Sequence, residues 1–179
     1  MPSAWVLLAE GFEEIEAVTI IDVLRRAHID VGVVGQAERP VCGSHGIHIV
    51  ADTTMTDVGD SLGDALVLPG GLPGSTNLRD DARVIQMVRR HVEQGRIVAA
   101  ICAAPIVLET AGVLTGRRAT GYPGHELPSA AYVEDRVVED SSILTSRGPG
   151  TALEFSLKLV ERLAGGDTAL ELRRRMLVA

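Results

Sequence analysis

The stretch Arg96-Ile97-Val98-Ala99-Ala100-Ile101-Cys102-Ala103-Ala104-Pro105 decides how this chain folds. The apolar run before the cysteine predicts a buried strand at 97–101. Pro105, which is tolerated in the first turn of a helix, predicts a helix at 104–111. Cys102 therefore stands on a sharp turn between a strand and a helix. The small residues Ala100 and Ala104 suit such a turn, because strand and helix pass close together around a nucleophile held there.

A thiol beside a helix N-terminus feels the positive end of the helix dipole, which favours the reactive thiolate. This reading makes Cys102 a nucleophile or an oxidisable sulfur. The alternative is a buried cysteine that packs as a small apolar side chain, which is a common fate of free cysteines. The position at a strand end favours the functional reading.

Strands and helices alternate along the rest of the chain. Strands are predicted at 4–9, 30–35, 65–68 and 97–101, with a hairpin at 41–51 and a late pair at 137–139 and 143–145. Helices are predicted at 13–28, 82–93 and 104–111. Two more close the chain, each opened by a capping-box pattern at 151–154 or 168–171. Because several strands are apolar throughout, we expect an α/β fold whose mostly parallel sheet carries helices on both faces. We expect one domain, 1–179.

Composition narrows the class of partner. The chain has 179 residues, a net charge of −7 and 3% aromatic residues, which argue against nucleic acid or an anionic membrane. Its apolar start is too short for a bilayer span and lacks the basic region of a signal peptide. The two cysteines, Cys42 and Cys102, lie far apart, which fits a reducing, cytoplasmic environment. We see no metal-binding motif and expect neither a metal nor a cofactor.

Ligands of open α/β sheets bind beyond the carboxyl ends of the strands, and three predicted strand ends carry chemical candidates. These are the segments 10–16 and 69–71, and Cys102. Glu16 shares a helical face with Ile20 and Val23, so its carboxyl group should be buried and protonated, able to donate a hydrogen bond to the sulfur. The alternative is a helix that begins later and leaves the glutamates at 13, 14 and 16 in solvent.

Further candidates have weaker signals. Backbone amides at Gly70, Gly71 and Ala103 could form an oxyanion hole, or the glycines could form an ordinary turn. Arg147, in the loop 146–151, could receive a carboxylate or phosphate, brace a subunit contact, or simply belong to a loop before a helix. Among the histidines, we expect His45 and His125 in loops from which they could reach the site, and His91 on an exposed helix face.

Taken together, four segments resemble the ThiJ/PfpI superfamily, and within it the parkinsonism-associated protein deglycase branch and its bacterial relatives. The segments are 9–16, 67–71, 99–105 and 144–151. The resemblance implies a flavodoxin-like three-layer sandwich and a homodimer. It also implies that Cys102 is the reactive, oxidisable cysteine, that Glu16 is its protonated partner, and that Gly71 and Ala103 supply backbone amides at the sulfur.

The chain departs from the family pattern at three positions. Protease members carry histidine directly after the cysteine, whereas this chain has Ala103, which disfavours a cysteine protease. Tyr122 stands where the parkinsonism-associated branch has a histidine, which argues against a histidine-assisted proton transfer from that position. His125 is the histidine close to it in sequence. His45 stands where the family often has an arginine beside the site.

Three functional hypotheses follow from this reading. The first is a stress-response enzyme, of glutathione-independent glyoxalase or protein deglycase (hydrolase) type, acting on small dicarbonyls or glycated adducts. The second is a redox sensor or redox-regulated chaperone that uses the oxidation of Cys102. The third is a non-catalytic dimerising domain, suggested by a second apolar set on the first helix, Ile15, Val18 and Ile21.

Overall fold

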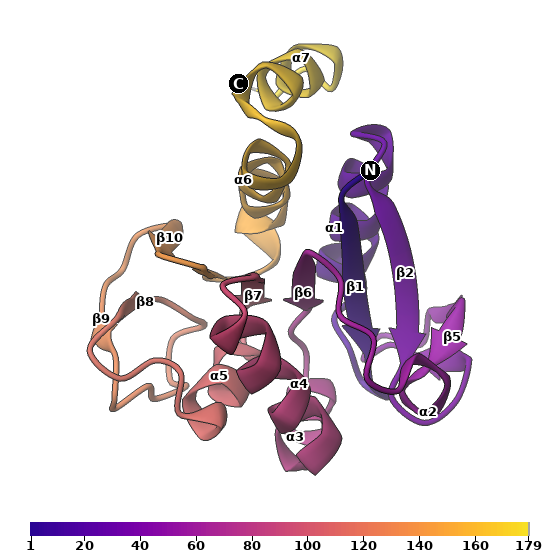
Figure 1. The fold of residues 1–179 in the computed structure, drawn as a ribbon, viewed down its shortest axis with the longest axis vertical. Helices are drawn as coiled ribbons and strands as arrows, with labels where there is room; N and C mark the ends of the chain where they lie inside the picture. Colours follow the sequence, from indigo (N-terminus) through magenta and orange to yellow (C-terminus); the bar gives the residue numbers. More distant parts are fainter. Residues whose placement is uncertain (179) are drawn as a thin grey trace.

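The protein is an α/β fold with one large, mostly parallel sheet between two layers of helices, as expected (Figure 1). We describe residues 1–178 of a computed structural model. The strands are β1 Ser3–Leu8, β2 Asp30–Gly35, β3 Pro40–Cys42, β4 His48–Val50, β5 Thr53–Thr54, β6 Ala65–Leu68, β7 Ile97–Ile101, β8 Arg118–Ala119, β9 Ala131–Tyr132, β10 Val137–Asp140 and β11 Ile143–Ser146. The helices are α1 Glu14–Arg26, α2 Met55–Val58, α3 Gly74–Asp80, α4 Ala82–Glu93, α5 Pro105–Ala111, α6 Ala152–Ala164 and α7 Gly166–Arg175, with a short 3-10 turn at Pro149–Thr151.

The large sheet has seven strands in the order β10-β11-β7-β6-β1-β2-β5. All neighbours are parallel except β10 and β11. Every residue of β6 and β7 is buried, because helices cover both faces of the sheet and leave no side for polar residues. The two central strands therefore read as unbroken apolar runs.

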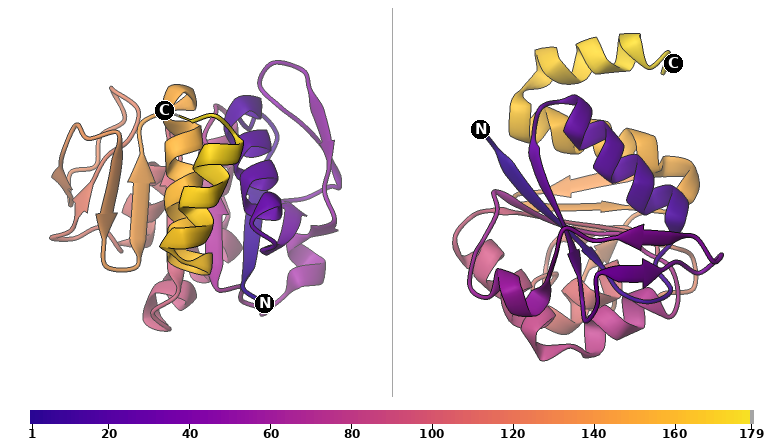
Figure 2. Two further views of the ribbon diagram at one scale, coloured as in Figure 1. Left: turned by 90° about the horizontal axis from the view of Figure 1, so that it is seen from above. Right: turned by 90° about the vertical axis from the view of Figure 1, so that its right-hand side faces the viewer.

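The two helical layers pack on opposite faces, which makes the three-layer sandwich (Figure 2). Helices α1 and α6 bury residues such as Ile20 and Phe155 in the core on one face, and α7 packs against α6. Helices α4 and α5 bury residues such as Val88 and Leu108 on the other face. No helix within residues 1–178 is long and apolar enough to cross a membrane.

The two capping-box predictions are wrong. Helix α6 does begin after Thr151, but the Thr151 hydroxyl bonds the backbone of Gly148 and the Ser146 hydroxyl instead of a helix amide. Helix α7 begins at Gly166, and Thr168 donates its hydroxyl proton back to the carbonyl of Ala164. In both cases the hydroxyl bonds to backbone groups of its preceding turn and accepts no amide of the following helix, which sequence spacing does not reveal.

Candidate active site

The three predicted strand ends meet at one edge of the sheet. Strands β1, β6 and β7 are neighbours, with Val6 beside Val67 and Leu68 beside Ala100. Because all three run in the same direction, the segments that follow them emerge at the same edge. This places the start of α1, the turn at 69–71 and Cys102 together, as the sequence predicts.

Cys102 occupies a strained turn held from both sides. Its φ of 64° lies in the left-handed region, which costs free energy for a residue with a side chain. The Cys102 amide donates to the carbonyl of Ser146 at 3.0 Å, and the Cys102 carbonyl accepts from the Tyr122 amide at 2.7 Å. These two bonds from distant segments fix the conformation and leave the residue 8% exposed.

Glu16 is fully buried beside the thiol. Helix α1 places it there: Glu13 caps the helix by accepting from the Glu16 amide at 2.8 Å. Oε2 of Glu16 accepts from the Gly70 amide at 2.7 Å. Within residues 1–178, Oε1 has no nitrogen or oxygen partner, and the carboxyl group interacts with the Cys102 thiol. The alternative of a solvated Glu16 is thus excluded by its burial.

Burial controls the protonation of both groups. Desolvation raises the pKa of Glu16 to about 7, against the lowering effect of the Gly70 amide and the thiol. Burial, the charge of Glu16 and its hydrogen bond raise the pKa of the Cys102 thiol to about 12. The expected gain from the helix dipole is outweighed, because Cys102 lies outside the helix and its surroundings are dry. Protonation of Glu16 removes the charge that opposes the thiolate.

Two glycines make room for this pair. A Cβ on Gly70 would lie 2.6 Å from Cys102 Cβ and 2.8 Å from Glu16 Oε2. Gly71 has a φ of 93°, and a Cβ there would lie 2.4 Å from the backbone nitrogen of Glu13. Backbone hydrogen bonds from Ala103 and Gly71 lower the pKa of the thiol. Of the three amides that the sequence singles out, those of Gly71 and Ala103 act on the sulfur, whereas the Gly70 amide donates to Glu16 Oε2 instead.

His45 interacts with Glu14. The His45 ring nitrogen Nδ1 lies 2.8 Å from Glu14 Oε2, and the hydrogen bond raises the pKa of His45. Glu14 also accepts from the amides of His45 and Ile47 in the hairpin loop. Burial opposes ionisation of Glu14, but these bonds outweigh it and lower its pKa to about 2. Sequence analysis missed this clamp, because its two parts lie about thirty residues apart and share no motif.

Tyr122, His125 and Arg147 gather on the other side of Cys102. The Tyr122 and His125 rings lie 6.1 Å apart. His125 and Arg147 line a cavity of about 460 Å³, which we call the Arg147 cavity. His91 is placed differently from our expectation: it is fully buried in α4, because its ring packs inward and Nδ1 bonds the Met87 carbonyl at 2.8 Å.

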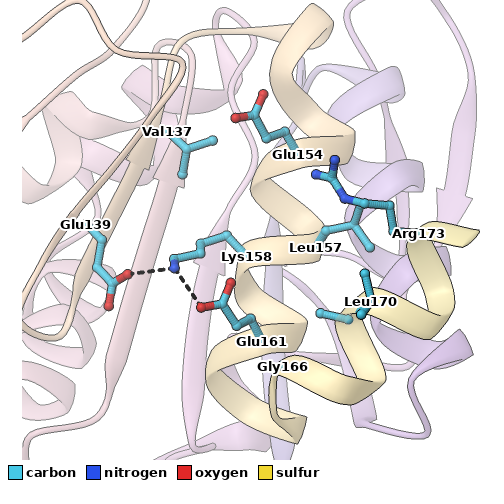
Figure 3. Close-up of a pocket in the computed structure, with 10 residues that line it drawn as sticks. Val137, Glu139, Glu154, Leu157, Lys158, Glu161, Gly166, Leu170 and Arg173 are labelled. Atoms are coloured by element: carbon cyan, nitrogen blue, oxygen red, sulfur yellow. Dashed lines mark hydrogen bonds and ion pairs between the residues drawn. The ribbon is translucent and has the colours of Figure 1, made fainter. Parts of the chain in front are cut away.

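A second cavity, of about 400 Å³, lies between β10, α6 and α7 (Figure 3). Its charged groups neutralise one another, since Lys158 pairs with Glu139 at 3.2 Å and with Glu161 at 2.9 Å. None of the predicted site residues lines this cavity. The chemistry therefore belongs to the sheet edge around Cys102.

Comparison with known proteins agrees with this geometry. The model of the DJ-1/PfpI family matches residues 2–162. Protein dj-1beta of Drosophila melanogaster is 43% identical over 182 residues, covering 99% of this chain and 97% of the relative. Protein DJ-1 homolog A of Arabidopsis thaliana is 45% identical over 177 residues, but this chain spans only 45% of its length and 96% of its own. A Caenorhabditis elegans relative named glutathione-independent glyoxalase DJR-1.2 is 35% identical over 181 residues, covering 99% of this chain and 97% of the relative.

Solved structures resemble the fold closely. The crystal structure of Drosophila melanogaster DJ-1beta superposes with a TM-score of 0.96 at 43% identity, covering 99% of this chain and 98% of the other. Oxidized Toxoplasma gondii DJ-1 superposes with a TM-score of 0.94 at 38% identity, covering both chains completely.

Proposed function

The chain belongs to the DJ-1/PfpI family, and from this premise we propose that it is a cysteine-dependent enzyme that converts small dicarbonyls to hydroxy acids. One observation carries the proposal: a fully buried carboxyl group, Glu16, faces the Cys102 thiol with its pKa raised to about 7. A group that titrates near neutral pH can both give and take a proton, which is what general acid–base catalysis requires. The glyoxalase name of a relative at 35% identity supports the same reaction class.

The first step forms a carbon–sulfur bond. Glu16 accepts the thiol proton, and the Cys102 sulfur attacks the aldehyde carbon of methylglyoxal. Glu16 then gives this proton to the aldehyde oxygen, which restores its carboxylate, and the product is a hemithioacetal. The amides of Gly71 and Ala103, which lower the pKa of the thiol, are the donors that we assign to the developing oxyanion.

The second step moves hydrogen within the bound molecule. Glu16 removes the proton from C1 and returns it to C2 through an enediol, so that C1 is oxidised and the ketone carbon is reduced. The result is a thioester of lactate on Cys102. Water then hydrolyses the thioester, releasing lactate and restoring the thiol. The sum is methylglyoxal plus one water giving lactic acid, with no external oxidant or cofactor.

Formation of D- or L-lactate from methylglyoxal tests this proposal. We expect activity in the wild type, loss of activity in Cys102→Ala, and at least a hundredfold loss in Glu16→Gln, as is typical when general acid–base catalysis is removed. Glu171→Gln, which changes an exposed carboxylate on α7, is the matched control and should retain activity. Equal rates in the wild type and in both site variants would overturn the proposal. Glycated amino acids assayed alongside would reveal a deglycase preference.

We also propose that the protein forms a homodimer through α1 and the β3–β4 hairpin. Ile15 and Val18 on α1, and Ile47 and Val50 on the hairpin, are 50% to 71% exposed. Glu14 binds the hairpin loop to α1, so these side chains belong to one rigid surface. Ile21, which we expected on this surface, packs instead against the core. A cluster of exposed large apolar residues is typical of an interaction surface.

A redox sensor or redox-regulated chaperone is the second candidate. The observation that favours it is the small residual exposure of the Cys102 thiol beside a carboxyl group that can donate a hydrogen bond to a sulfinate. Intact mass after mild peroxide tests it. A gain of two oxygens on the wild type but not on Cys102→Ala is expected, and a thiol that gains no oxygen at low peroxide argues against it.

A further inference from the structure

The Arg147 cavity is not used by the reaction proposed above. Its volume of about 460 Å³ lies within the range of sites that hold whole small molecules, and a three-carbon dicarbonyl would leave most of it empty. Leu127, Pro128 and Tyr132 contribute apolar wall, while His125, Glu134 and Arg147 contribute polar groups. Mostly apolar walls with a few polar groups are the usual composition of a ligand site.

The walls of this cavity are attached to Cys102. Arg147 directly follows Ser146, whose carbonyl accepts the Cys102 amide proton. On the opposite wall, the Tyr132 hydroxyl donates to the Gly121 carbonyl at 3.1 Å. The residue after Gly121 is Tyr122, and its amide donates to the Cys102 carbonyl. The cavity and the cysteine turn are thus held by the same peptide segments.

Arg147 has most of its hydrogen-bonding capacity to spare. Among residues 1–178, only its Nη1 has acceptors, the Glu134 carbonyl at 3.4 Å and Glu134 Oε2 at 3.9 Å. The Glu134 side chain is 79% exposed, so this ion pair is weak and easily replaced. A planar guanidinium offers paired N–H groups that match the two oxygens of a carboxylate.

We infer that the Arg147 cavity is a subsite for the side chain of larger α-oxoaldehydes, and that Arg147 selects those ending in a carboxylate. This inference rests on the proposed function of Cys102. A monoanion is favoured over a phosphate dianion, because Glu126 and Glu134 also line the cavity and like charges repel. The reaction is the one written above: with 4,5-dioxopentanoate, the aldehyde is oxidised, the ketone is reduced, one water is consumed and 2-hydroxyglutarate is released.

Two α-oxoaldehydes of equal length test the selection. The carboxylate 4,5-dioxopentanoate and the neutral 2-oxopentanal differ only at the end that would reach Arg147. We expect kcat/KM to favour the carboxylate in the wild type, and the ratio of the two kcat/KM values to fall on the order of tenfold in Arg147→Gln, as for loss of one charge-assisted hydrogen bond. Arg175→Gln removes a positive charge from the exposed surface of α7 and should leave the ratio unchanged.

The variant Glu134→Gln shows whether Arg147 contacts the ligand or only stabilises the loop. If the Arg147–Glu134 pair only braces the loop, both glutamine substitutions break the same pair and should shift the ratio in the same direction. If Arg147 binds the ligand, Glu134→Gln removes a competitor and the ratio should rise, opposite to Arg147→Gln. Shifts in the same direction, or no shift in Arg147→Gln, would overturn the inference.

A binding measurement keeps this test independent of catalysis. The ligand 4-oxopentanoate lacks an aldehyde, so it cannot form the proposed hemithioacetal intermediate, and 2-pentanone is its neutral counterpart. We expect 4-oxopentanoate to bind Cys102→Ala more tightly than 2-pentanone does, and Arg147→Gln in that background to abolish the difference. Equal affinities of the two ligands for Cys102→Ala would overturn the subsite even if methylglyoxal is turned over. Loss of turnover with the binding preference intact would count against the proposed function alone.

Discussion

Cys102 and Glu16 hold one proton between them over the pH range that separates their pKa values, about 7 and about 12. When the thiol carries the proton, Glu16 is a buried carboxylate, and when Glu16 carries it, Cys102 is a buried thiolate. The pair is therefore costly to the fold, and the hydrogen bond from Gly70 to Glu16 offsets only part of that cost. At the residue scale, the group to which we assign the chemistry therefore destabilises the fold.

This cost predicts how stability depends on pH. Because the pKa of Glu16 rises from 4.5 in the unfolded chain to about 7 in the folded protein, the native state binds the proton more tightly between these values. The contribution of Glu16 to stability should therefore be complete below about pH 4.5 and should fall as the pH rises toward 7. Glu16→Gln should remove this fall and be more stable than the wild type at pH 8 by up to roughly 3 kcal/mol.

Urea denaturation at pH 5 and pH 8 measures this difference. Glu134→Gln serves as the control, because its exposed carboxylate should leave the pH dependence unaltered. A wild-type protein as stable at pH 8 as at pH 5, with Glu16→Gln showing the same profile, would contradict the prediction.

Gly70 offers a second test at this scale. An added Cβ would meet Cys102, Glu16 and the backbone oxygen of Ile101 within 2.8 Å, and a backbone oxygen cannot move aside cheaply. We expect Gly70→Ala to lower the free energy of unfolding by about 1–3 kcal/mol and to displace Glu16 from the thiol. Gly150→Ala is the matched control, since a Cβ there meets nothing within 4 Å. Similar unfolding midpoints for the two variants would show that the turn tolerates a side chain.

At the scale of elements, the strands are predictable and the cap contacts are not. The strands at 30–35, 65–68 and 97–101 and the helix at 82–93 have the predicted bounds, because an apolar run between turn residues has few other ways to be buried. The caps at Thr151 and Thr168 fail because a hydroxyl chooses among several nearby acceptors. Helix α3 was missed, since its sequence, GSTNLRD, resembles a loop and only its packing beside the site makes it helical.

The burial of His91 was predictable in principle, because His91 recurs with Val84 and Val88 at helical spacing on the buried face of α4. Its ring has one hydrogen bond, to Met87, and Nε2 has none within residues 1–178. Burial lowers the pKa of His91, so the folded protein holds it neutral while the unfolded chain protonates it below about pH 6.5. Stability from this group should therefore be lost as the pH falls below that value.

His91→Phe should reduce this sensitivity to acid. We expect the thermal midpoint at pH 5, relative to that at pH 7, to rise in His91→Phe and to be unchanged in His48→Gln, which changes an exposed histidine. Because Glu16 and His91 drive stability in opposite directions below pH 7, the wild type alone shows only their sum. An unchanged pH difference in His91→Phe would exclude the buried imidazole as the acid-sensitive group.

At the scale of the whole molecule, the position of the site is predictable from the sequence, because the carboxyl ends of parallel strands lie at one edge of the sheet. That rule places Cys102, Glu16 and Gly70 together without any coordinates. It does not place Ser146 and Tyr122, whose backbones hold the cysteine turn, because backbone contacts leave no residue-type signal. The Glu14 clamp on the hairpin was hidden because its two parts lie about thirty residues apart and share no motif.

The proposed dimer yields the prediction at this scale. Val18→Asp and Val50→Asp each place a charge on an exposed apolar residue, which association would have to bury unpaired. We expect the wild type to sediment as a dimer and both variants as monomers at the same concentration. Leu170→Asp, on the exposed surface of α7, should remain dimeric. A monomeric wild type would remove the basis for the proposal.

The two bonds that hold Cys102 also have a consequence for biosynthesis. The Tyr122 amide and the Ser146 carbonyl follow the cysteine by 20 and 44 residues, and β11, which ends at Ser146, pairs directly with β7. While the chain leaves the ribosome, Cys102 is therefore an ordinary thiol on an unsupported turn. Its special geometry appears only after nearly the entire chain has been made. The buried pairing of Cys102 with Glu16 therefore depends on backbone segments that are synthesised well after both residues.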